Sequence, residues 1–487
     1  MSPTRASPAA RWPSAGAALG AGLLLTAGLP PLGWWPLALP GAGILAFLLR
    51  DRAPAGRLAV GAAAGVGFLG PGLLWMTEFH LAGFVLAVVL QVGLFALGPA
   101  AAPAGRGQAL GLPAALVLVE AFRGVWPFGG VPIATLAQTQ VGGPLAFTSR
   151  VGGGLLVAAL VGVAGVGLAA LVRRAWATGG VGAGVVVTLV VTGLVAPSGR
   201  DVGAIDVAVV QGGGPRGLRA VDNPSARGLE AALEATEQLP PGVDLVVWPE
   251  NAVTVEGELA GSPQDATVGA AARRLGATLV AGVVERRGDR FRNLAVAWGP
   301  DGLLIDRYEK NQRVPFGEYV PWRSFVGRFA DLRAVPRDAL VGEGPGLLAT
   351  PAGDLGVVIS YEVFFPRRAR AAVEAGGEVL LVPTNASSYP TTQMPALELG
   401  AARLRALETG RVVVQAAPTG FSAFVGPDGT VRRQSDLGAP AVLTARVELR
   451  TGATPYTRAG DAPFAALAGA ALAGAWALSR RPPRPRG

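Results

Sequence analysis

The chain has 487 residues, of which 51% are hydrophobic, 15% are charged and none is Cys. This length and apolar content predict more than one domain and at least one membrane segment, and the absence of Cys excludes disulfides and thiol catalysis. The net charge of +9 raises the possibility of a nucleic-acid partner. The basic residues before residue 200 are scattered between apolar runs and form no basic stripe, so we expect a membrane protein that binds no nucleic acid.

Eight apolar runs are long enough to be candidate membrane spans. They cover residues 14–30, 33–49, 58–76, 82–104, 107–122, 151–172, 180–197 and 462–479. Several are rich in Gly and Ala, which suits the close packing of helices in lipid. The sequence therefore predicts a helical transmembrane bundle of about eight spans, with a polytopic domain over residues 14–197 and a C-terminal helix over residues 462–479.

The arginines in the loops between these runs indicate an orientation. With the N-terminus inside, the outer loops hold only Arg123 and Arg150. The inner loops hold Arg50, Arg52, Arg57, Arg106, Arg173 and Arg174. Loops rich in Arg normally stay in the cytoplasm. This pattern predicts cytoplasmic tails at residues 1–13 and 480–487, and a domain outside the membrane at residues 198–461.

Residues 198–461 alternate short apolar runs with stretches of helix formers. The expected strands lie at residues 206–211, 244–250, 278–285, 355–362, 378–385 and 412–420, and the expected helices at residues 225–238, 263–275 and 397–409. Such alternation predicts a layered α/β domain. Polar residues fall at the ends of expected strands, namely Glu250, Ser360, Glu362 and Asn385. Ligands of open α/β sheets bind at that edge.

The basic residues contain one informative exception. Of the 42 Lys and Arg residues only Lys310 is a lysine, and the only histidine, His80, precedes the outer domain. A domain without His cannot use Ser-His-Asp chemistry or His-bound zinc. Unlike Arg, a desolvated Lys can lower its pKa and exchange protons. We interpret Lys310 as a functional residue; the alternative is an ordinary surface lysine.

Two carboxylates and one hydroxyl are candidate partners of Lys310. Glu250 closes the run DLVVWPE, and Glu318 lies in the turn-rich segment PFGEYVP. A Glu held against apolar groups can have a raised pKa and act as a base. Ser360 follows the apolar run 355–359 and can occupy a strand-to-helix elbow that exposes a nucleophile. Taken singly, each Glu also fits a solvated loop, and Ser360 also fits a helix cap or turn.

The motifs WPEN, YEKNQRVPFGEYVP and ISYEVFFP have the order and spacing of the nitrilase superfamily. Together with the apolar runs, they make the chain resemble the apolipoprotein N-acyltransferase family, and the resemblance covers almost the whole chain. Further matching segments lie at residues 120–132, 210–212, 384–387, 402–408 and 454–461. The resemblance implies an αββα sandwich for residues 198–461.

The resemblance also implies roles for six residues. The family's triad is Glu, Lys and Cys, and here Ser360 stands at the position of the Cys. Glu250 would be the proton acceptor, Lys310 would stabilise the oxyanion, and Ser360 would carry the acyl group. Glu318 and Glu362 would orient Lys310 or the substrate, and Tyr361 would support the pocket. Because a hydroxyl is less acidic than a thiol, a neutral Lys310 is an alternative base.

The family's reaction is a two-step acyl transfer. It implies a phospholipid acyl donor, a diacylglyceryl lipoprotein as acceptor, and a multi-pass position in the bacterial cell membrane with the catalytic domain on the extracytoplasmic face. It implies no cofactor and no metal. Two other functions remain open at this point: a membrane-anchored amidase, and a partner protein that has kept the fold with impaired catalysis.

Overall fold

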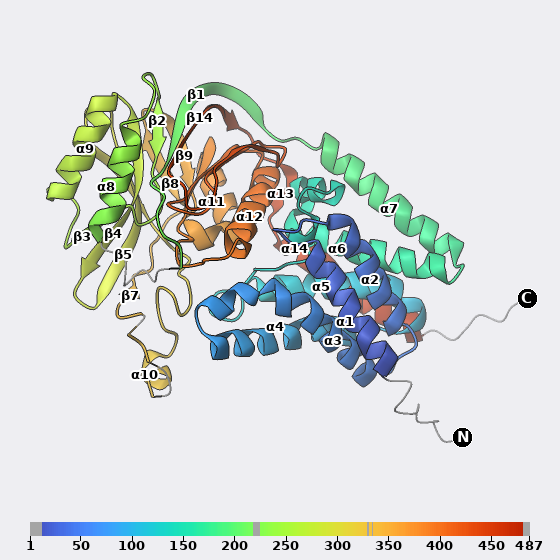
Figure 1. Cartoon of the computed structure of the whole chain (residues 1–487). Coiled ribbons are helices and arrows are strands. Elements are labelled where there is room, and N and C mark those ends of the chain that lie inside the picture. The colour runs from blue at the N-terminus through green and yellow to red at the C-terminus, as the bar shows by residue number, and fades with distance from the viewer. Residues whose placement is uncertain (1–11, 218–224, 329–330, 334, 481–487) are drawn as a thin grey trace, which may run out of the picture. The chain divides into compact units, whose positions relative to one another are not determined.

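The computed structural model describes residues 12–217, 225–328, 331–333 and 335–480. The chain divides into two compact units, Met1–Ala196 with Ala459–Gly487, and Pro197–Arg458 (Figure 1). These divisions lie close to the expected boundaries at residues 198 and 461. Of the expected tails, residues 1–11 and 481–487 lie outside the described residues.

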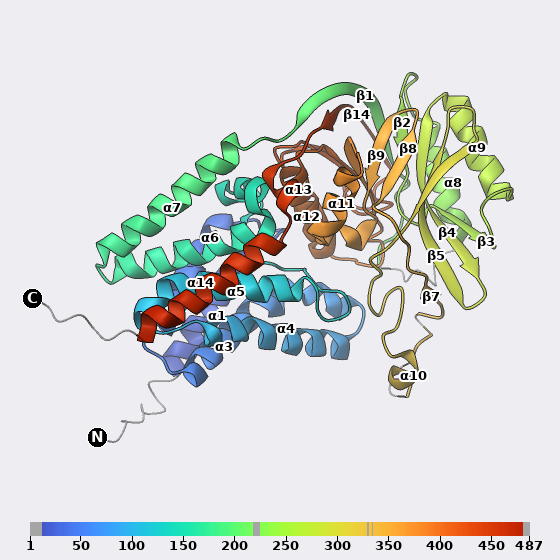
Figure 2. The same ribbon diagram turned by 180° about the vertical axis from the view of Figure 1, so that it is seen from behind.

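The described part of the first unit is helical. Its α-helices are α1 (Trp12–Ala27), α2 (Trp35–Leu49), α3 (Pro54–Gly72), α4 (Leu81–Ala101), α5 (Gln108–Arg123), α6 (Ser149–Val172), α7 (Trp176–Val195) and α14 (Ala462–Arg480). Figure 2 shows α14 packed beside α5. Helices α1 and α3 approach so closely that a Cβ on Gly22 would lie 2.0 Å from the carbonyl oxygen of Ala64. Only Gly permits that approach.

Each of the eight expected spans overlaps one of these helices, but they differ in length. Four segments are long and apolar enough to cross a membrane: Leu81–Ala101, Pro144–Val172, Trp176–Val195 and Ala462–Arg480. The segments Ser14–Ala27 and Trp35–Leu49 are shorter apolar helices. The helical bundle is therefore present, and the number of about eight spans stays a prediction.

The second unit contains two β-sheets. The first has the strand order β14-β1-β2-β4-β5-β6, with β3 paired to β4 and β7 paired to β5. Its strands are β1 (Arg200–Gln211), β2 (Leu245–Val247), β3 (Val253–Glu256), β4 (Thr278–Arg287), β5 (Arg290–Trp298), β6 (Leu304–Glu309), β7 (Asp338–Ala339) and β14 (Ala441–Thr451). Strands β1, β2 and β4 are parallel, so their carboxyl ends point the same way.

The second sheet has the order β13-β12-β11-β10-β9-β8. Its strands are β8 (Leu347–Thr350), β9 (Gly353–Val357), β10 (Val379–Pro383), β11 (Val413–Ala416), β12 (Ala423–Val425) and β13 (Val431–Gln434). The helices of the unit are α8 (Ser225–Thr236), α9 (Pro263–Leu275), α10 (Arg323–Val326), α11 (Pro366–Glu374), α12 (Gln393–Thr409) and α13 (Pro455–Ala459).

Apolar side chains join the layers of this unit. Val209 and Val247 of the first sheet meet Val357 and Leu381 of the second in one buried cluster. Another cluster joins the opposite face of the first sheet to α8 and α9, and α11 and α12 cover the second sheet. The order helices–sheet–sheet–helices is the expected αββα sandwich.

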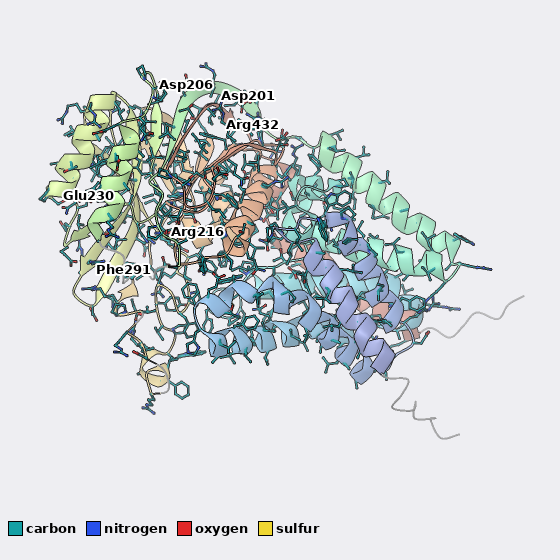
Figure 3. The ribbon with its side chains drawn as sticks, in the orientation of Figure 1. Asp201, Asp206, Arg216, Glu230, Phe291 and Arg432 are labelled. Carbon is teal, nitrogen blue, oxygen red and sulfur yellow. The ribbon has the colours of Figure 1, made fainter. Side chains whose placement is uncertain are left out.

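Some charged side chains of the second unit lie on its outside, as Asp206, Glu230 and Arg432 illustrate (Figure 3). Asp206 pairs with Arg446 at 3.5 Å, and Arg432 pairs with Glu448 at 3.0 Å. Exposed pairs of this kind contribute only about 0–1 kcal/mol each. The buried apolar layers, rather than these pairs, hold the sandwich together.

Candidate active site

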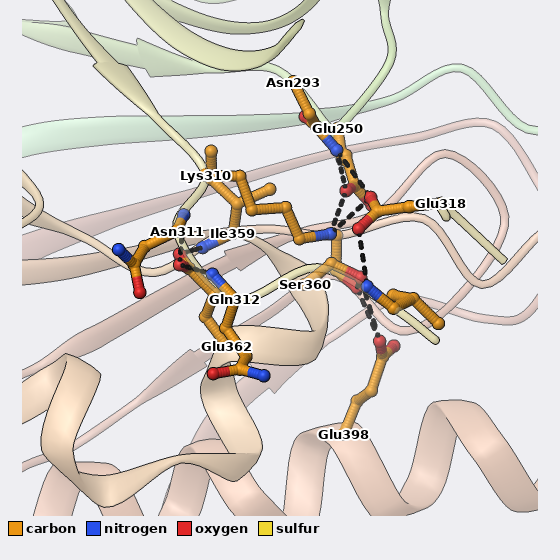
Figure 4. A network of polar contacts seen from close by, with 12 residues as sticks. Glu250, Asn293, Lys310, Asn311, Gln312, Glu318, Ile359, Ser360, Glu362 and Glu398 are labelled. Carbon is orange, nitrogen blue, oxygen red and sulfur yellow. Dashed lines mark hydrogen bonds and ion pairs between the residues drawn. The ribbon is translucent and has the colours of Figure 1, made fainter. Parts of the chain in front are cut away.

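Lys310 lies at the centre of a buried polar cluster. It follows the last residue of β6, and its backbone N–H donates to the carbonyl of Asn293 on β5 at 2.8 Å. Its Nζ donates to Glu250 Oε1 at 2.9 Å and to Glu318 Oε1 at 2.8 Å (Figure 4). An ammonium has three N–H donors, and the third has no hydrogen-bond partner among the described residues. One donor is therefore left for a substrate oxygen.

Asn293 ties the two carboxylates together. Its Nδ2 donates to Glu250 Oε1 at 2.8 Å and to Glu318 Oε1 at 2.9 Å. The other oxygen of Glu318 accepts from the backbone N–H of Val314 at 2.8 Å. Each carboxylate is thus fixed by more than one donor, and Lys310 occupies a rigid slot between them.

Burial and charge act in opposite directions in this cluster. Burial raises the pKa of Glu250. The Lys310 charge and the hydrogen bonds from Lys310 and Asn293 lower it by less, so the pKa of Glu250 lies above its ordinary value. Burial lowers the pKa of Lys310, but Glu250 and Glu318 raise it by more, so the net pKa lies above the ordinary value. The raised pKa favours a charged Lys310 over the alternative of a neutral Lys310 as base, because the two carboxylates outweigh desolvation.

Ser360 lies at a sharp turn after β9. Its φ of 50° is in the left-handed region, which is strained for a residue other than Gly. It opens the short 3-10 helix Ser360–Phe364. Its Oγ lies 3.2 Å from the hydroxyl of Thr384 and 3.4 Å from Glu398 Oε1. The expected strand 355–362 ends at Val357 because the chain turns here. The turn directs the Ser360 hydroxyl toward Thr384 and Glu398.

Glu362 connects this turn to the segment that carries Lys310. Its Oε1 accepts from the backbone N–H groups of Asn311 at 2.9 Å and Gln312 at 3.0 Å. Its Oε2 accepts from the N–H of Ile359 at 2.8 Å, and the Tyr308 hydroxyl donates to Oε1 at 2.8 Å. Glu362 therefore lies inside the 3-10 turn rather than at a strand end, and it ties the backbone next to Lys310 to the turn that begins at Ser360.

Tyr361 is buried beside the turn. Its ring packs edge-on against Phe365 at 5.0 Å and lies 6.1 Å from the Phe364 ring. Burial raises the pKa of its phenol. Tyr361 thus packs against two phenylalanines in the turn that begins at Ser360.

The structure brings the three triad positions into one region. Both Glu250 and Lys310 act electrostatically on Glu398, which contacts Ser360, and Figure 4 shows all four side chains converging. A fixed ammonium near a turned-out hydroxyl, with carboxylates on either side, suits acyl transfer: the hydroxyl attacks a carbonyl and the ammonium stabilises the oxyanion. Asn385, the other strand-end polar residue, instead accepts from Ser387 at 2.6 Å.

Three contacting residues were not singled out by the sequence. Asn293, Thr384 and Glu398 all form hydrogen bonds within the cluster. The sequence signal that could have identified two of them is a polar residue inside an apolar strand or helix. Asn293 lies in FRNLAVAW, and Glu398 lies in MPALELGAA. Among the described residues, no group of three or more His, Cys, Asp and Glu side chains is arranged to hold a metal ion.

Comparison with known proteins identifies the family of each unit. Residues 206–456 match the family model described as carbon-nitrogen hydrolase, which covers more than half of the chain. The second unit is therefore a carbon-nitrogen hydrolase domain. Residues 21–167 match the model described as the apolipoprotein N-acyltransferase N-terminal domain. The chain belongs to the apolipoprotein N-acyltransferase family, a family of acyltransferases.

Curated relatives match both units. The apolipoprotein N-acyltransferase of Mycolicibacterium smegmatis is 33% identical over 94% of this chain and 84% of its own length. That of Azotobacter vinelandii is 32% identical over 96% of each chain. Among solved structures, Saccharomyces cerevisiae Nit3, of branch 10 of the nitrilase superfamily, is 20% identical, covers 52% of this chain and 92% of its own, and has a TM-score of 0.39.

Proposed function

We propose that the chain transfers an acyl group from a phospholipid to the α-amino group of the N-terminal diacylglyceryl-cysteine of an apolipoprotein, the last step of lipoprotein maturation. The relatives that match over nearly the whole chain carry the name of this activity. The observation that carries the proposal is Lys310, whose ammonium is held between two carboxylates with one donor left over, in the cluster that contains Ser360.

The proposed reaction has two halves. In the first, Ser360 Oγ attacks the ester carbonyl of the phospholipid and Lys310 Nζ stabilises the oxyanion. The bond to the leaving oxygen then breaks, and the lysophospholipid leaves as an alcohol with the proton that Ser360 has lost. In the second, the acceptor amine attacks the Ser360 ester and Glu250 acts as the proton acceptor. Burial raises the pKa of Glu250, which suits it to that role. Glu318 and Glu362 position Lys310, and Tyr361 supports the turn that begins at Ser360.

We place this reaction at the bacterial cell membrane, with residues 198–461 on the extracytoplasmic face. Both substrates are membrane lipids, so a catalytic domain attached to several apolar helices meets them where they reside. The Arg-rich loops on the opposite side support that orientation.

Complementation tests this function. A bacterial strain depleted of its own N-acyltransferase would express the chain, and mass spectrometry would read the N-terminus of a reporter lipoprotein. The proposal predicts a triacylated N-terminus with wild type and a diacylated one with Ser360→Ala. Ser387→Ala is the matched control, because the Ser387 hydroxyl donates to Asn385 and, among the described residues, forms no hydrogen bond with Lys310. A diacylated product with both wild type and Ser360→Cys would contradict the proposal and favour a non-catalytic partner.

A further inference from the structure

A buried carboxylate other than Glu250 and Glu318 contacts the Ser360 hydroxyl. Glu398 lies on α12, is only 3% exposed, and none of the roles given above uses it. Its Oε1 accepts from the Thr384 hydroxyl at 2.8 Å and lies 3.4 Å from Ser360 Oγ (Figure 4). Among the described residues, no Lys or Arg forms an ion pair with it. A buried carboxylate whose contacts are two hydroxyls is poised to take up a proton.

Glu250 is placed differently. Its Oε1 accepts from both Lys310 Nζ and Asn293 Nδ2, and within the described residues it has no hydrogen bond to Ser360. Those bonds stabilise the charged form of Glu250 and hold it on Lys310. Among the described residues, the carboxylate that contacts the attacking hydroxyl is therefore Glu398, which Figure 4 shows on the other side of Ser360 from Glu250.

The chemistry of Ser360 makes a second base useful. A thiol has a pKa of about 8.5, so a neighbouring ammonium can help it to ionise. A hydroxyl is far less acidic and needs a base that accepts its proton during attack. Burial and the nearby Glu250 charge raise the pKa of Glu398 to about 7, against the lowering effects of Thr384, Lys310 and Ser360. A base that titrates near neutral pH is well matched to this task.

We propose that Glu398 is the general base for Ser360, and that the Thr384 hydroxyl holds it in place; this inference rests on the proposed function. As Ser360 Oγ bonds to the acyl carbon, its proton passes to Glu398 Oε1 and the carbonyl π electrons move to the oxygen beside Lys310. When the bond to the leaving oxygen breaks, the carbonyl re-forms and Glu398 returns the proton to that oxygen. The products are the Ser360 ester, a neutral alcohol and an ionised Glu398.

The distance of 3.4 Å is compatible with this role. Catalytic hydrogen bonds are commonly long in the free enzyme and shorten in the substrate complex. The Thr384 hydroxyl donates its one proton to Glu398, so the Ser360 hydroxyl keeps its own proton directed at the same carboxylate oxygen. The short contact of 2.8 Å fixes the carboxylate within reach of the nucleophile.

A comparison of four proteins tests the proposal: wild type, Glu398→Gln, Ser360→Cys and the double variant. The full-length chain in detergent would react with p-nitrophenyl butyrate, and stopped-flow absorbance would follow the first turnover. We expect Glu398→Gln to slow acylation at least 100-fold when residue 360 is Ser, the usual size of a general-base effect. With Cys at residue 360 we expect a loss of less than 10-fold, because a thiol depends less on that base.

Controls separate the base role from a structural one. An equal loss in the Ser and Cys backgrounds would overturn the proposal, as would an unchanged rate for Glu398→Gln with Ser at residue 360. Leu397→Met changes the neighbouring buried position of α12 at nearly constant volume, and we expect it to retain the rate. If Glu398→Gln does not fold, Glu398→Asp takes its place in the comparison. A slower acylation in Glu398→Asp than in Leu397→Met supports the base role if the thermal unfolding of Glu398→Asp is unchanged.

The pH profile gives a second readout. The wild-type acylation rate should rise with pH through about 7 and then level off, since Glu398 must be ionised to accept the proton. The groups that face Glu398 are Glu250, Lys310, Thr384 and Ser360, and all remain in Glu398→Gln. That variant should lose the rise near 7, and retention of the rise would contradict the proposal.

The same data distinguish the two proposals. A wild-type Ser360 adduct with p-nitrophenyl butyrate but no triacylated reporter lipoprotein would reject the proposed substrates and leave Glu398 as the base. Absence of any wild-type adduct would reject both, because Ser360 would then not be a nucleophile.

Discussion

Lys310 is held by charge rather than by apolar packing. The sequence singles it out as the one lysine among 42 basic residues. In the structure it is buried between Glu250 and Glu318, and Asn293 holds both carboxylates from the other side. This slot accepts a compact ammonium that donates in three directions. An arginine offers a wider, planar fork and needs more room.

Lys310→Arg should therefore lose acyl transfer although the charge is kept. We expect acylation of Ser360 to fall at least about 100-fold, since removing an oxyanion donor has an effect of that order. Arg292→Lys is the matched control, because Arg292 lies on β5, has a 28% exposed side chain and pairs with Glu309 at 3.6 Å. The first-turnover rate measures both, and intact activity in Lys310→Arg would refute the role of Lys310.

At the level of single residues, motifs predicted more than local composition did. Glu250, Lys310, Glu318 and Ser360 received their roles from the motifs of the family resemblance, and the structure brings Lys310 into contact with both glutamates. Glu398 was missed because a Glu in a helix normally faces water. Its burial arises from packing of α12 on the second sheet, and its apolar neighbours in MPALELGAA were the local signal for that burial.

At the level of elements, Glu362 fastens the end of β6 to the turn at Ser360. It has no exposed surface and accepts from the N–H groups of Asn311, Gln312 and Ile359. Every one of these partners is a hydrogen-bond donor. A Gln side chain in place of Glu362 would point its NH₂ group, also a donor, at one of them, and that hydrogen bond would be lost. The whole link depends on a carboxylate with two acceptor oxygens.

Glu362→Gln should destabilise the carbon-nitrogen hydrolase domain by about 3 kcal/mol, the usual effect of breaking a buried charged hydrogen-bond network. Thermal unfolding in detergent would show this as a lower midpoint, together with slower acylation. Glu448→Gln is the comparison, because its pair with Arg432 is partly exposed and contributes about 0–1 kcal/mol. Equal midpoints for the two variants would contradict the positioning role of Glu362.

The elements predicted best were the buried parallel strands. Runs such as 206–211, 278–285 and 378–385 are apolar on both faces, and each became a strand. The antiparallel strands β5, β6 and β13 were not predicted, since charged residues interrupt them, as in VRRQ and RFRNLAVAW. The helices at residues 225–238, 263–275 and 397–409 were each found near the expected bounds.

At the level of the whole molecule, composition predicted two kinds of unit, one of packed apolar helices and one of layered sheets. The sandwich was predicted from the family resemblance and is observed. The eight helices also appear, and within the described residues four segments reach the length and hydropathy of a membrane span. Short Gly-rich helices such as α1 pack closely on their neighbours. Their apolar runs therefore do not distinguish a membrane span from a buried helix of the bundle.

The central claim is that Ser360 carries the acyl group between two lipid substrates. The most direct measurement is mass spectrometry of the full-length chain after incubation with a phospholipid that carries an isotopically labelled acyl chain. Proteolysis would locate the label. The account predicts a labelled ester on Ser360 that disappears when a diacylglyceryl lipopeptide is added. A triacylated lipopeptide formed with no label on Ser360, or with the label on another residue, would contradict it.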